Sequence, residues 1–191
     1  MPKRHKVVLI AEQNLIFCSQ FLRDKRFGME INMDITFKTE QGRFNYRVCA
    51  IIINDGKLLA MHNETTPYFY LPGGRVKFNE TVEEAIVREM QEELNIRCEI
   101  VRPLWLNQSF FEEDRTHEKF HEICVYFLVD ISKTDILSKG DKFELNNNEG
   151  AYQSFEWLDF NRVKEEYLYP TFIKERINNL PENFEILIER E

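Results

Sequence analysis

Three glutamates near the middle of the chain, Glu89, Glu92 and Glu93, have a spacing that would let their carboxylates act together. On a helix, Glu92 falls at about −60° and Glu93 at about +40° from Glu89, beside an apolar arc that contains Ile86 and Met90. Two carboxylates about 5 Å apart repel by roughly 3 kcal/mol at an effective dielectric of about 20. A hard cation such as Mg²⁺ or Mn²⁺ prefers oxygen ligands and would remove this repulsion. The stripe therefore predicts a divalent metal site.

The helix that carries these glutamates has clear start and stop signals. Thr81 followed by Glu84 matches a capping box, which predicts Thr81 as the N-cap of a helix over residues 82–94. Asn95 should end the helix, because asparagine tolerates the left-handed conformation of a C-terminal cap. The same helical wheel turns Arg88 away from the carboxylate stripe. A plainer interpretation treats the glutamates as exposed helix formers paired with basic neighbours. The fixed spacing of the residues from Gly74 to Ile96, described next, decides against it.

From Gly74 to Ile96 the sequence resembles the signature box of the Nudix hydrolases, G-x5-E-x7-R-E-U-x-E-E-x-G-U, where U is apolar. Every fixed position matches except the last glycine, which is Asn95 here. The resemblance extends over roughly residues 34–180. It implies an α/β (α+β) fold, the Nudix-type αβα sandwich with a mixed central β-sheet. We therefore expect an N-terminal extension over residues 1–32 and a Nudix hydrolase domain over residues 33–191.

The resemblance also implies a chemistry. Nudix enzymes hydrolyse a nucleoside diphosphate linked to another group. Divalent cations bridge the pyrophosphate oxygens and activate the attacking water molecule. Carried over position by position, the box places three metal ligands on the helix: Glu89, Glu92 and Glu93. Gly73 would offer its backbone carbonyl to a metal ion, since a residue without a side chain lets the backbone approach closely. Glu80 and Arg88 would form the ion pair that ties the preceding loop to the helix.

Residues outside the box would complete the site. Many family members add a glutamate from a later loop, and Glu149 is the first candidate for this further metal ligand, ahead of Glu118 and Glu122. The aromatic side chains that could stack on a base are Phe44, Tyr46, Phe110, Phe111 and Phe120. The basic side chains that could contact phosphate are Arg43, Arg47 and Arg75. For each aromatic residue, a place in the core is the competing interpretation.

Composition restricts the partners. The 191 residues carry a formal net charge of −8, so the surface should on average repel nucleic acid and anionic membranes. No segment reaches the about 18 apolar residues that a membrane-spanning helix needs. The four cysteines form no CxxC pair, which favours reduced thiols in a cytoplasmic protein over a zinc site or a disulfide.

The remaining pattern predicts strands around a few helices. Strands are expected up to residue 37, then over 46–53, 57–63, 97–105, 106–111, 120–130, 154–160 and 183–191. The triplet Asn54-Asp55-Gly56 signals a hairpin turn, and the polar stretch 139–150 is the best loop candidate. Residues 161–168 are expected to form a short helix, and Pro170 to open a last helix that reaches about residue 179.

The favoured function is a Mg²⁺-dependent or Mn²⁺-dependent hydrolase that cleaves a diphosphate bond in a small nucleotide derivative. The alternative is a catalytically silent Nudix-fold module that binds a nucleotide or an ADP-ribose-like ligand; such modules usually lose box carboxylates that are all present here. An enzyme acting on RNA 5′ ends is disfavoured by the acidic chain. An isoprenoid diphosphate isomerase is disfavoured because no cysteine occupies an obvious catalytic loop. A homodimer is a family-level expectation.

Overall fold

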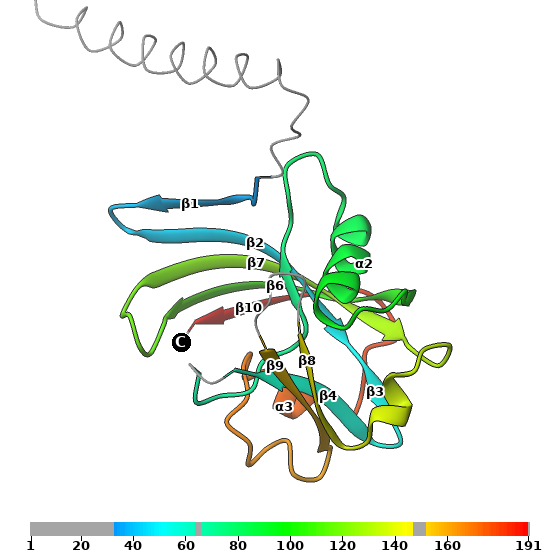
Figure 1. Ribbon diagram of the computed structural model, residues 1–191. Coiled ribbons are helices and arrows are strands. Elements are labelled where there is room, and N and C mark those ends of the chain that lie inside the picture. The colour runs from blue at the N-terminus through cyan, green and yellow to red at the C-terminus, as the bar shows by residue number, and fades with distance from the viewer. Residues whose placement is uncertain (1–32, 64–65, 147–151, 191) are drawn as a thin grey trace, which may run out of the picture. The chain divides into compact units, whose positions relative to one another are not determined.

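The computed structural model describes residues 33–63, 66–146 and 152–190 (Figure 1). The expected N-terminal extension, residues 1–32, and the candidate ligand Glu149 both lie outside the described residues. Two β-sheets dominate the described part of the chain. The larger sheet contains β1 (Thr36–Thr39), β2 (Gly42–Ile51), β7 (Lys119–Asp130), β6 (Glu99–Glu112) and β10 (Glu185–Arg190) in that order, with β5 (Gly73–Arg75) paired to β2.

The larger sheet is mixed, as expected. Strand β2 runs parallel to β7, and β10 runs parallel to β6, whereas the β1–β2, β2–β5 and β6–β7 pairs are antiparallel. Strands β1 and β5 both pair with β2, β1 along residues 42–45 and β5 along residues 47–49. The glycine turn that opens the signature box is thereby fixed at the edge of the sheet.

The smaller sheet is antiparallel and has the order β3 (Ile53–Asn54), β4 (Lys57–His62), β9 (Tyr152–Asp159) and β8 (Lys142–Asn146). The predicted hairpin between β3 and β4 is confirmed. Asp55 has a φ of 47° and Gly56 a φ of 71°, the two left-handed residues that a two-residue type I′ turn requires.

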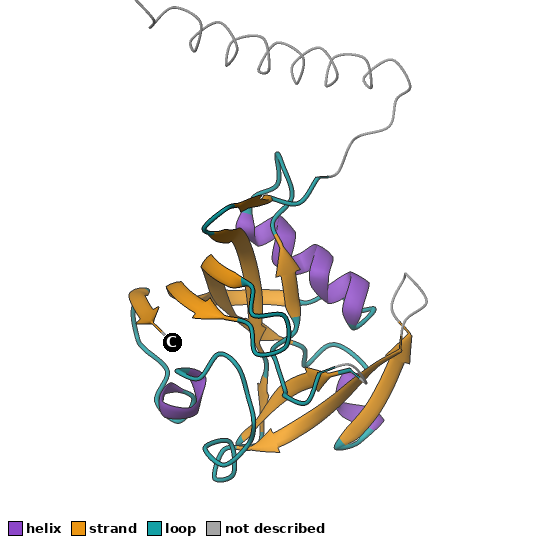
Figure 2. Cartoon of the chain, turned by 90° about the vertical axis from the view of Figure 1, so that its left-hand side faces the viewer, coloured by secondary structure: helices purple, strands orange, loops and turns teal. Residues whose placement is uncertain are grey.

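In the part of the chain that the structure describes, three helical elements accompany the sheets: α2 (Val82–Glu93), the 3₁₀ helix η2 (Ile136–Lys139) and α3 (Ile173–Arg176). Helix α2 covers one face of the larger sheet, where Ile86 and Met90 pack against Val48 and Val125 (Figures 1 and 2). On the other face of β2, Ile51 belongs to a second core together with buried side chains of residues 163–177, which include α3. The two cores confirm the αβα arrangement. None of the helices in the described ranges is long and apolar enough to cross a membrane.

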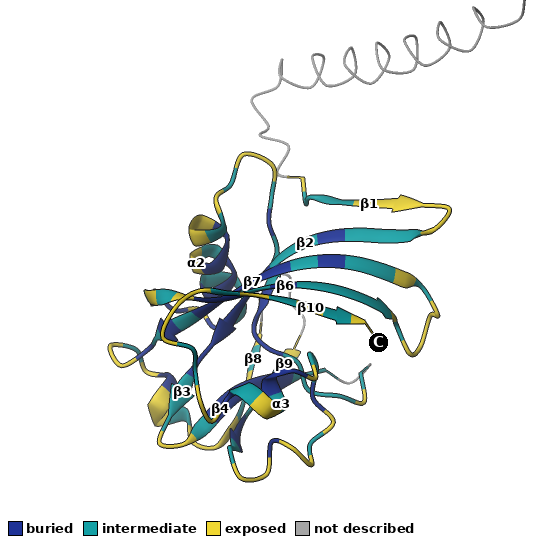
Figure 3. Ribbon diagram, turned by 180° about the vertical axis from the view of Figure 1, so that it is seen from behind, coloured by how far each residue is buried: buried dark blue, intermediate teal, exposed yellow. Residues whose placement is uncertain are grey.

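The larger sheet is only partly covered. Figure 3 shows its buried residues where the strands pass beneath α2, whereas the halves that reach the β1–β2 and β6–β7 turns are mostly intermediate in exposure. These less covered halves form the walls and the floor of the cavities described below.

Two predictions are wrong because sheet pairing overrides local composition: the break between strands after residue 105, and the loop at residues 142–146. A single long strand, β6, replaces the two strands expected over 97–105 and 106–111, since the β6–β7 ladder continues through Trp105 and Leu106. Residues 142–146, expected to be a loop, form the edge strand β8. Phe143 and Leu145 pack against the core, whereas Lys142, Glu144 and Asn146 are exposed, so this polar stretch follows the two-residue period of a strand.

The helix expected over 161–168 is also wrong, because these residues form turns. Their end is held in an extended conformation: the Phe69 N–H donates to Tyr167 O at 2.7 Å, and the Tyr169 N–H donates to Phe69 O at 2.9 Å. The last helix is shorter than expected, since α3 covers only Ile173–Arg176. The final strand is confirmed as β10.

Candidate active site

The start and end of α2 fix the direction of its carboxylates. The Glu84 N–H donates to Thr81 Oγ1 at 3.2 Å, and the Thr81 N–H donates to Glu84 Oε2 at 2.9 Å, which confirms the predicted capping box. At the other end, Asn95 has a φ of 56°, the left-handed conformation predicted from its residue type. Both ends therefore follow local rules, and together they set which residues of α2 face the sheet.

The glycine turn before α2 allows an unusually close approach between backbone and carboxylate. Gly73 has a φ of 144°, and a Cβ added there would collide with the Val48 carbonyl of β2. A Cβ added to Gly74 would collide with the carboxylate of Glu89. The two glycines therefore let the chain lie against strand β2 on one side and against the acidic side chain on the other.

Two of the three predicted ligands lie beside this turn, Glu89 buried and Glu93 partly buried. Glu93 Oε2 accepts a hydrogen bond of 2.8 Å from the Gly73 N–H. Burial, followed by the charge of Glu89, raises the pKa of the Glu93 carboxyl to about 8. Glu89 is only 8% exposed, and burial raises its pKa as well, although the Arg88 guanidinium opposes that shift. Such carboxylates cost free energy to ionise unless a cation joins them.

Arg88 does not point away from the stripe, and that expectation is wrong. Its Nη1 donates to Glu89 Oε1 at 2.6 Å and to Glu92 Oε2 at 3.0 Å, and its Nη2 donates to the Arg75 carbonyl at 2.9 Å. The guanidinium also forms the ion pair with Glu80 that the resemblance implied, at 2.6 Å. A helical wheel gives only the direction of the Cα–Cβ bond, whereas the long arginine stem curves back over the helix.

The donor set suits a hard divalent cation. Glu89, Glu92 and Glu93 offer carboxylate oxygens around a turn whose backbone carbonyls are close by, and Mg²⁺ and Mn²⁺ favour such ligands. Within the described ranges, however, no three acidic, histidine or cysteine side chains converge as a ready ligand set. Arg88 instead holds Glu89 and Glu92. The residues fit the ion in chemistry and proximity, and side-chain rotations away from Arg88 would be needed to join them on one ion.

A cavity of about 450 Å³ lies next to the glycine turn; we call it the inner cavity. Its lining residues include Arg47, Tyr70, Glu122 and Tyr169. Arg47 Nη2 donates to the Gly73 carbonyl at 3.4 Å, and the Nε atom of Arg47 is buried without a hydrogen-bond partner among the described residues. Gly73 thus contacts Glu93 through its N–H and Arg47 through its carbonyl, and it joins the carboxylates to the cavity.

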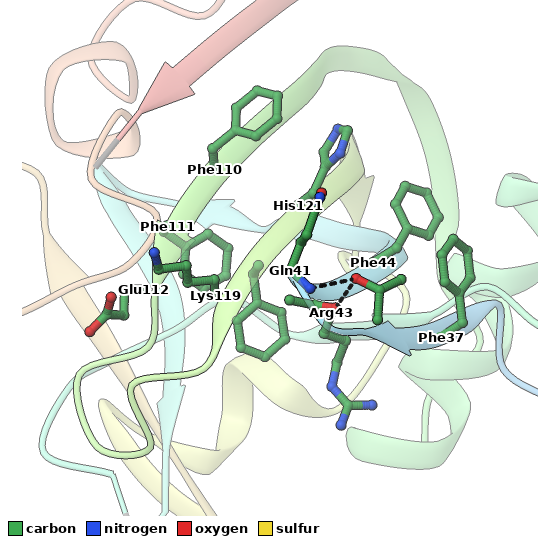
Figure 4. A pocket seen from close by; sticks show the side chains of 12 residues that line it. Phe37, Gln41, Arg43, Phe44, Phe110, Phe111, Glu112, Lys119 and His121 are labelled. Carbon is green, nitrogen blue, oxygen red and sulfur yellow. Dashed lines mark hydrogen bonds between the residues drawn. The ribbon is translucent and has the colours of Figure 1, made fainter.

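A second cavity of about 650 Å³, the tip cavity, lies at the turns that end β1 and β6 (Figure 4). Most of the aromatic candidates meet there: Phe44, Phe110, Phe111 and Phe120. Phe44 stands edge-on to His121 with ring centroids 5.7 Å apart, and His121 stacks on Phe110 at 4.4 Å. These rings pack against one another across the strands, so much of their surface is already covered. Tyr46 packs against the core beneath α2 instead.

The charged candidates lie in different parts of the structure. Arg43 lines the tip cavity and forms an ion pair with Glu118 at 3.0 Å. Arg75 donates to Asn45 Oδ1 at 3.2 Å. Among the basic and acidic candidates, Arg47 and Glu122 line the inner cavity.

Several residues of the inner cavity were missed by the sequence reasoning. Tyr68 and Tyr169 line its wall, and their rings meet edge to face with centroids 5.1 Å apart. Asp114 Oδ2 accepts hydrogen bonds from Tyr167 at 2.7 Å and from Tyr169 at 3.2 Å, which ties the β6–β7 turn to this group. The signal that could have found the group is the pair of short tyrosine-rich runs, 68–70 and 167–169, each next to a proline.

The chain is similar in sequence to known proteins. The model of the NUDIX domain family matches residues 43–177. An ADP-ribose pyrophosphatase of Methanocaldococcus jannaschii is 33% identical over 108 residues, which are 52% of this chain and 62% of the relative. An mRNA-decapping protein of fowlpox virus is 32% identical over 111 residues, 56% of this chain and 46% of the relative. The chain thus spans less than two thirds of the length of these relatives. The crystal structure of a MutT protein from Bacillus halodurans has 13% identity and a TM-score of 0.49 over 76% of this chain and 88% of that chain.

Proposed function

This chain belongs to the NUDIX domain family, and from that premise we propose that it is a divalent-metal-dependent hydrolase of a diphosphate bond in a nucleoside diphosphate derivative. The observation that carries the proposal is the contact of Glu89 with Gly74 and of Glu93 with Gly73, directly beside a cavity. Acidic side chains withdrawn from solvent at a cavity are suited to holding cations against an anionic substrate. The ADP-ribose pyrophosphatase relative supports a diphosphate as the group that is cleaved.

We propose Mg²⁺ or Mn²⁺ as the metal, held by Glu89, Glu92 and Glu93 with the Gly73 carbonyl. When bound, the ion would neutralise diphosphate oxygens and make a bound water more acidic. The ion pair between Arg88 and Glu80 ties the loop to the helix, which keeps the carboxylates at the glycine turn. Arg47, whose buried Nε has no hydrogen-bond partner among the described residues, is the cation that we assign to a phosphate oxygen in the inner cavity.

The competing function is a silent module that binds a nucleotide without cleaving it. All the acidic positions of the signature box are present in this chain, which favours catalysis. A role at RNA 5′ ends is suggested only by the fowlpox relative, and the net charge of −8 opposes it. The cytoplasmic location and the homodimer expected from the sequence stay predictions.

Product analysis by mass spectrometry tests the proposal. The purified chain is incubated with Mg²⁺ and with dNTPs, NTPs, ADP-ribose, NADH, nucleotide sugars and dinucleoside polyphosphates. A Glu92→Gln/Glu93→Gln variant provides the negative control. We expect cleavage at a diphosphate bond by the wild type and none by the variant. Binding of metal and nucleotide without any cleavage would support the silent module instead.

A further inference from the structure

The floor of the inner cavity is a row of polar side chains that crosses the larger sheet. In the strand registers, Asn45 of β2 is opposite Glu122 of β7, Glu122 is opposite Ser109 of β6, and Ser109 is opposite Glu189 of β10. Directly paired residues point to the same face of a sheet, so these four side chains share one face. Glu122, Ser109 and Glu189 all line the cavity.

Glu122 is the central residue of this row, and its carboxylate is only partly satisfied. It is 8% exposed, and within the described residues it accepts one hydrogen bond, from Asn45 Nδ2 at 3.3 Å, and forms no ion pair within 4.0 Å. A buried carboxylate has room for about four hydrogen bonds and is costly to leave without them. Glu122 therefore has unused acceptor capacity that faces a cavity.

Arg47 lines the same cavity, and the charge of Glu122 acts on its guanidinium. Its guanidinium contacts the Gly73 carbonyl, next to the carboxylates of α2, and its Nε lacks a partner in the described chain. Asn45, which precedes Arg47 by two residues on β2, is paired with Glu122 in the row of polar side chains. The cavity thus presents a cation where the proposed diphosphate would lie and carboxylates one row farther from the metal site.

We propose that Glu122 determines specificity: the inner cavity accepts a neutral or cationic group rich in hydrogen-bond donors, attached to the diphosphate, and rejects a further phosphate there. This inference rests on the proposed function, because it takes the diphosphate to lie at the metal site. A hydroxyl or ammonium group satisfies the free acceptors of Glu122, whereas a phosphate would bring like charge against a buried carboxylate. A site built for donors discriminates strongly against analogues that lack them.

Two groups share this donor chemistry, the polyhydroxy group of a sugar and an ammonium group. Tyr68, Tyr70, Tyr126 and Tyr169 line the same cavity. Tyrosine faces suit a quaternary ammonium as well as a sugar ring, so the two sources must be separated by experiment.

The test compares substrates that share a nucleoside. ADP-ribose and ATP differ in whether a ribose or a phosphate follows the diphosphate, and CDP-choline and CTP differ in the same way for an ammonium. The wild type should have a kcat/KM at least about 10-fold higher for ADP-ribose than for ATP, or for CDP-choline than for CTP. The pair that shows the larger ratio identifies the sugar or the ammonium as the preferred group. A wild type that prefers ATP and CTP would overturn the inference.

Glu122→Gln should lower kcat/KM for the preferred diphosphate about 10-fold to 100-fold, mainly through KM, and should leave triphosphate hydrolysis unchanged or raise it. Glu122→Asp retains the charge, so it should still reject the triphosphates; it also serves if the Gln variant folds poorly. Glu144→Gln removes an exposed carboxylate from the edge strand β8 and should match the wild type. An equal loss on both substrate types in Glu122→Gln and Glu122→Asp would mean a merely structural role and overturn the inference.

Calorimetric binding of ADP-ribose, CDP-choline, ATP and CTP, with Mg²⁺ present, separates this inference from the proposed function. If no compound is hydrolysed, the proposed function fails, and the binding ratios still decide the inference. Tighter binding of the donor-bearing member of a pair, weakened about 10-fold or more in Glu122→Gln, supports it. Equal binding by the wild type and Glu122→Gln overturns it.

Discussion

Arg88 and Glu80 form a bidentate ion pair in which Arg88 Nε donates to Glu80 Oε1 at 2.6 Å and Arg88 Nη2 donates to Glu80 Oε2 at 2.9 Å. The Lys77 N–H donates to the same Oε2 at 2.9 Å. Because Glu80 precedes α2 and Arg88 lies in its second half, the pair fixes the loop after the glycine turn against the helix. Both side chains are largely buried, at 14% and 18% exposure, so solvent screens the pair less than it screens an exposed one.

Glu80→Gln should therefore lower the free energy of unfolding by about 1–3 kcal/mol at pH 7, the usual range for hydrogen bonds to charged groups. Urea denaturation followed by circular dichroism measures the change. Glu99→Gln, which removes an exposed pair with Lys133, should cost no more than about 1 kcal/mol. A cost for Glu80→Gln no larger than that of this control would contradict a stabilising role for the pair.

The same pair predicts a pH dependence. Partial burial opposes ionisation of Glu80, but the hydrogen bonds from Arg88 and the Lys77 N–H outweigh it and lower the pKa below its ordinary value of 4.5. Since the folded pKa is depressed, the contribution to stability is full above the unfolded pKa and is lost as pH falls through the folded pKa. The stability difference between wild type and Glu80→Gln should shrink between about pH 5 and pH 3. A difference that stays constant over that window would refute this linkage.

Metal binding should stabilise the folded chain. A ligand at ten times its Kd adds about 1.4 kcal/mol to the folded state, which corresponds to a rise in Tm of about 3–6 °C for a domain of this size. Differential scanning fluorimetry with millimolar Mg²⁺ or Mn²⁺ measures this shift. Glu93→Gln should keep the Tm of the metal-free fold, because an amide oxygen still accepts from the Gly73 N–H, yet it should lose both the metal shift and turnover. An active Glu93→Gln variant would mean that the ligand is misassigned.

How well the sequence predicts a feature of the structure depends on how many residues separate the interacting partners along the chain. The capping box, the left-handed Asn95 and the turn at Asp55-Gly56 were all predictable, because each depends on residues within one turn of chain. The resemblance implied the pair of Arg88 with Glu80, but the contacts of Arg88 with Glu89, Glu92 and the Arg75 carbonyl were not predictable from the helical wheel. The fixed spacing of the signature box leads to Glu89, Glu92 and Glu93 as the proposed ligands, but it carries no information about the side chains that surround them.

The inner cavity was beyond sequence reasoning for the same reason. Its charged end depends on a contact between Arg47 and Gly73, 26 residues apart, and its floor on one between Asn45 and Glu122, 77 residues apart. The first contact follows from the antiparallel pairing of β2 with β5, and the second from the parallel pairing of β2 with β7. Periodicity within a single strand does not reveal either pairing. Arg47 and Glu122 each appeared as one candidate among several, and only the strand register singles them out.

The glycine turn gives a further prediction. Gly74→Ala should reduce metal binding and turnover at least about 10-fold, because the added Cβ collides with the Glu89 carboxylate and must displace it. Titration of Mn²⁺ by electron paramagnetic resonance and steady-state kinetics measure both effects. Gly56→Ala is the matched control, since a Cβ there meets nothing within 4 Å and the φ of 71° costs only about 1 kcal/mol of stability. Unchanged metal affinity in Gly74→Ala would show that Glu89 need not lie against the turn.

Arg47→Met should lower kcat/KM for the diphosphate substrate about 10-fold to 100-fold, mainly by raising KM, because it removes the cation assigned to a phosphate oxygen. Arg47→Lys keeps the charge but loses the planar fork, so its kcat/KM should fall between those of the wild type and Arg47→Met. Arg162→Met, which removes an exposed pair with Glu166, should behave as the wild type. Because Arg47 is flanked by the charge of Glu122, unfolding must be measured alongside kinetics. A folded Arg47→Met variant with an unchanged KM would place the phosphates away from the inner cavity.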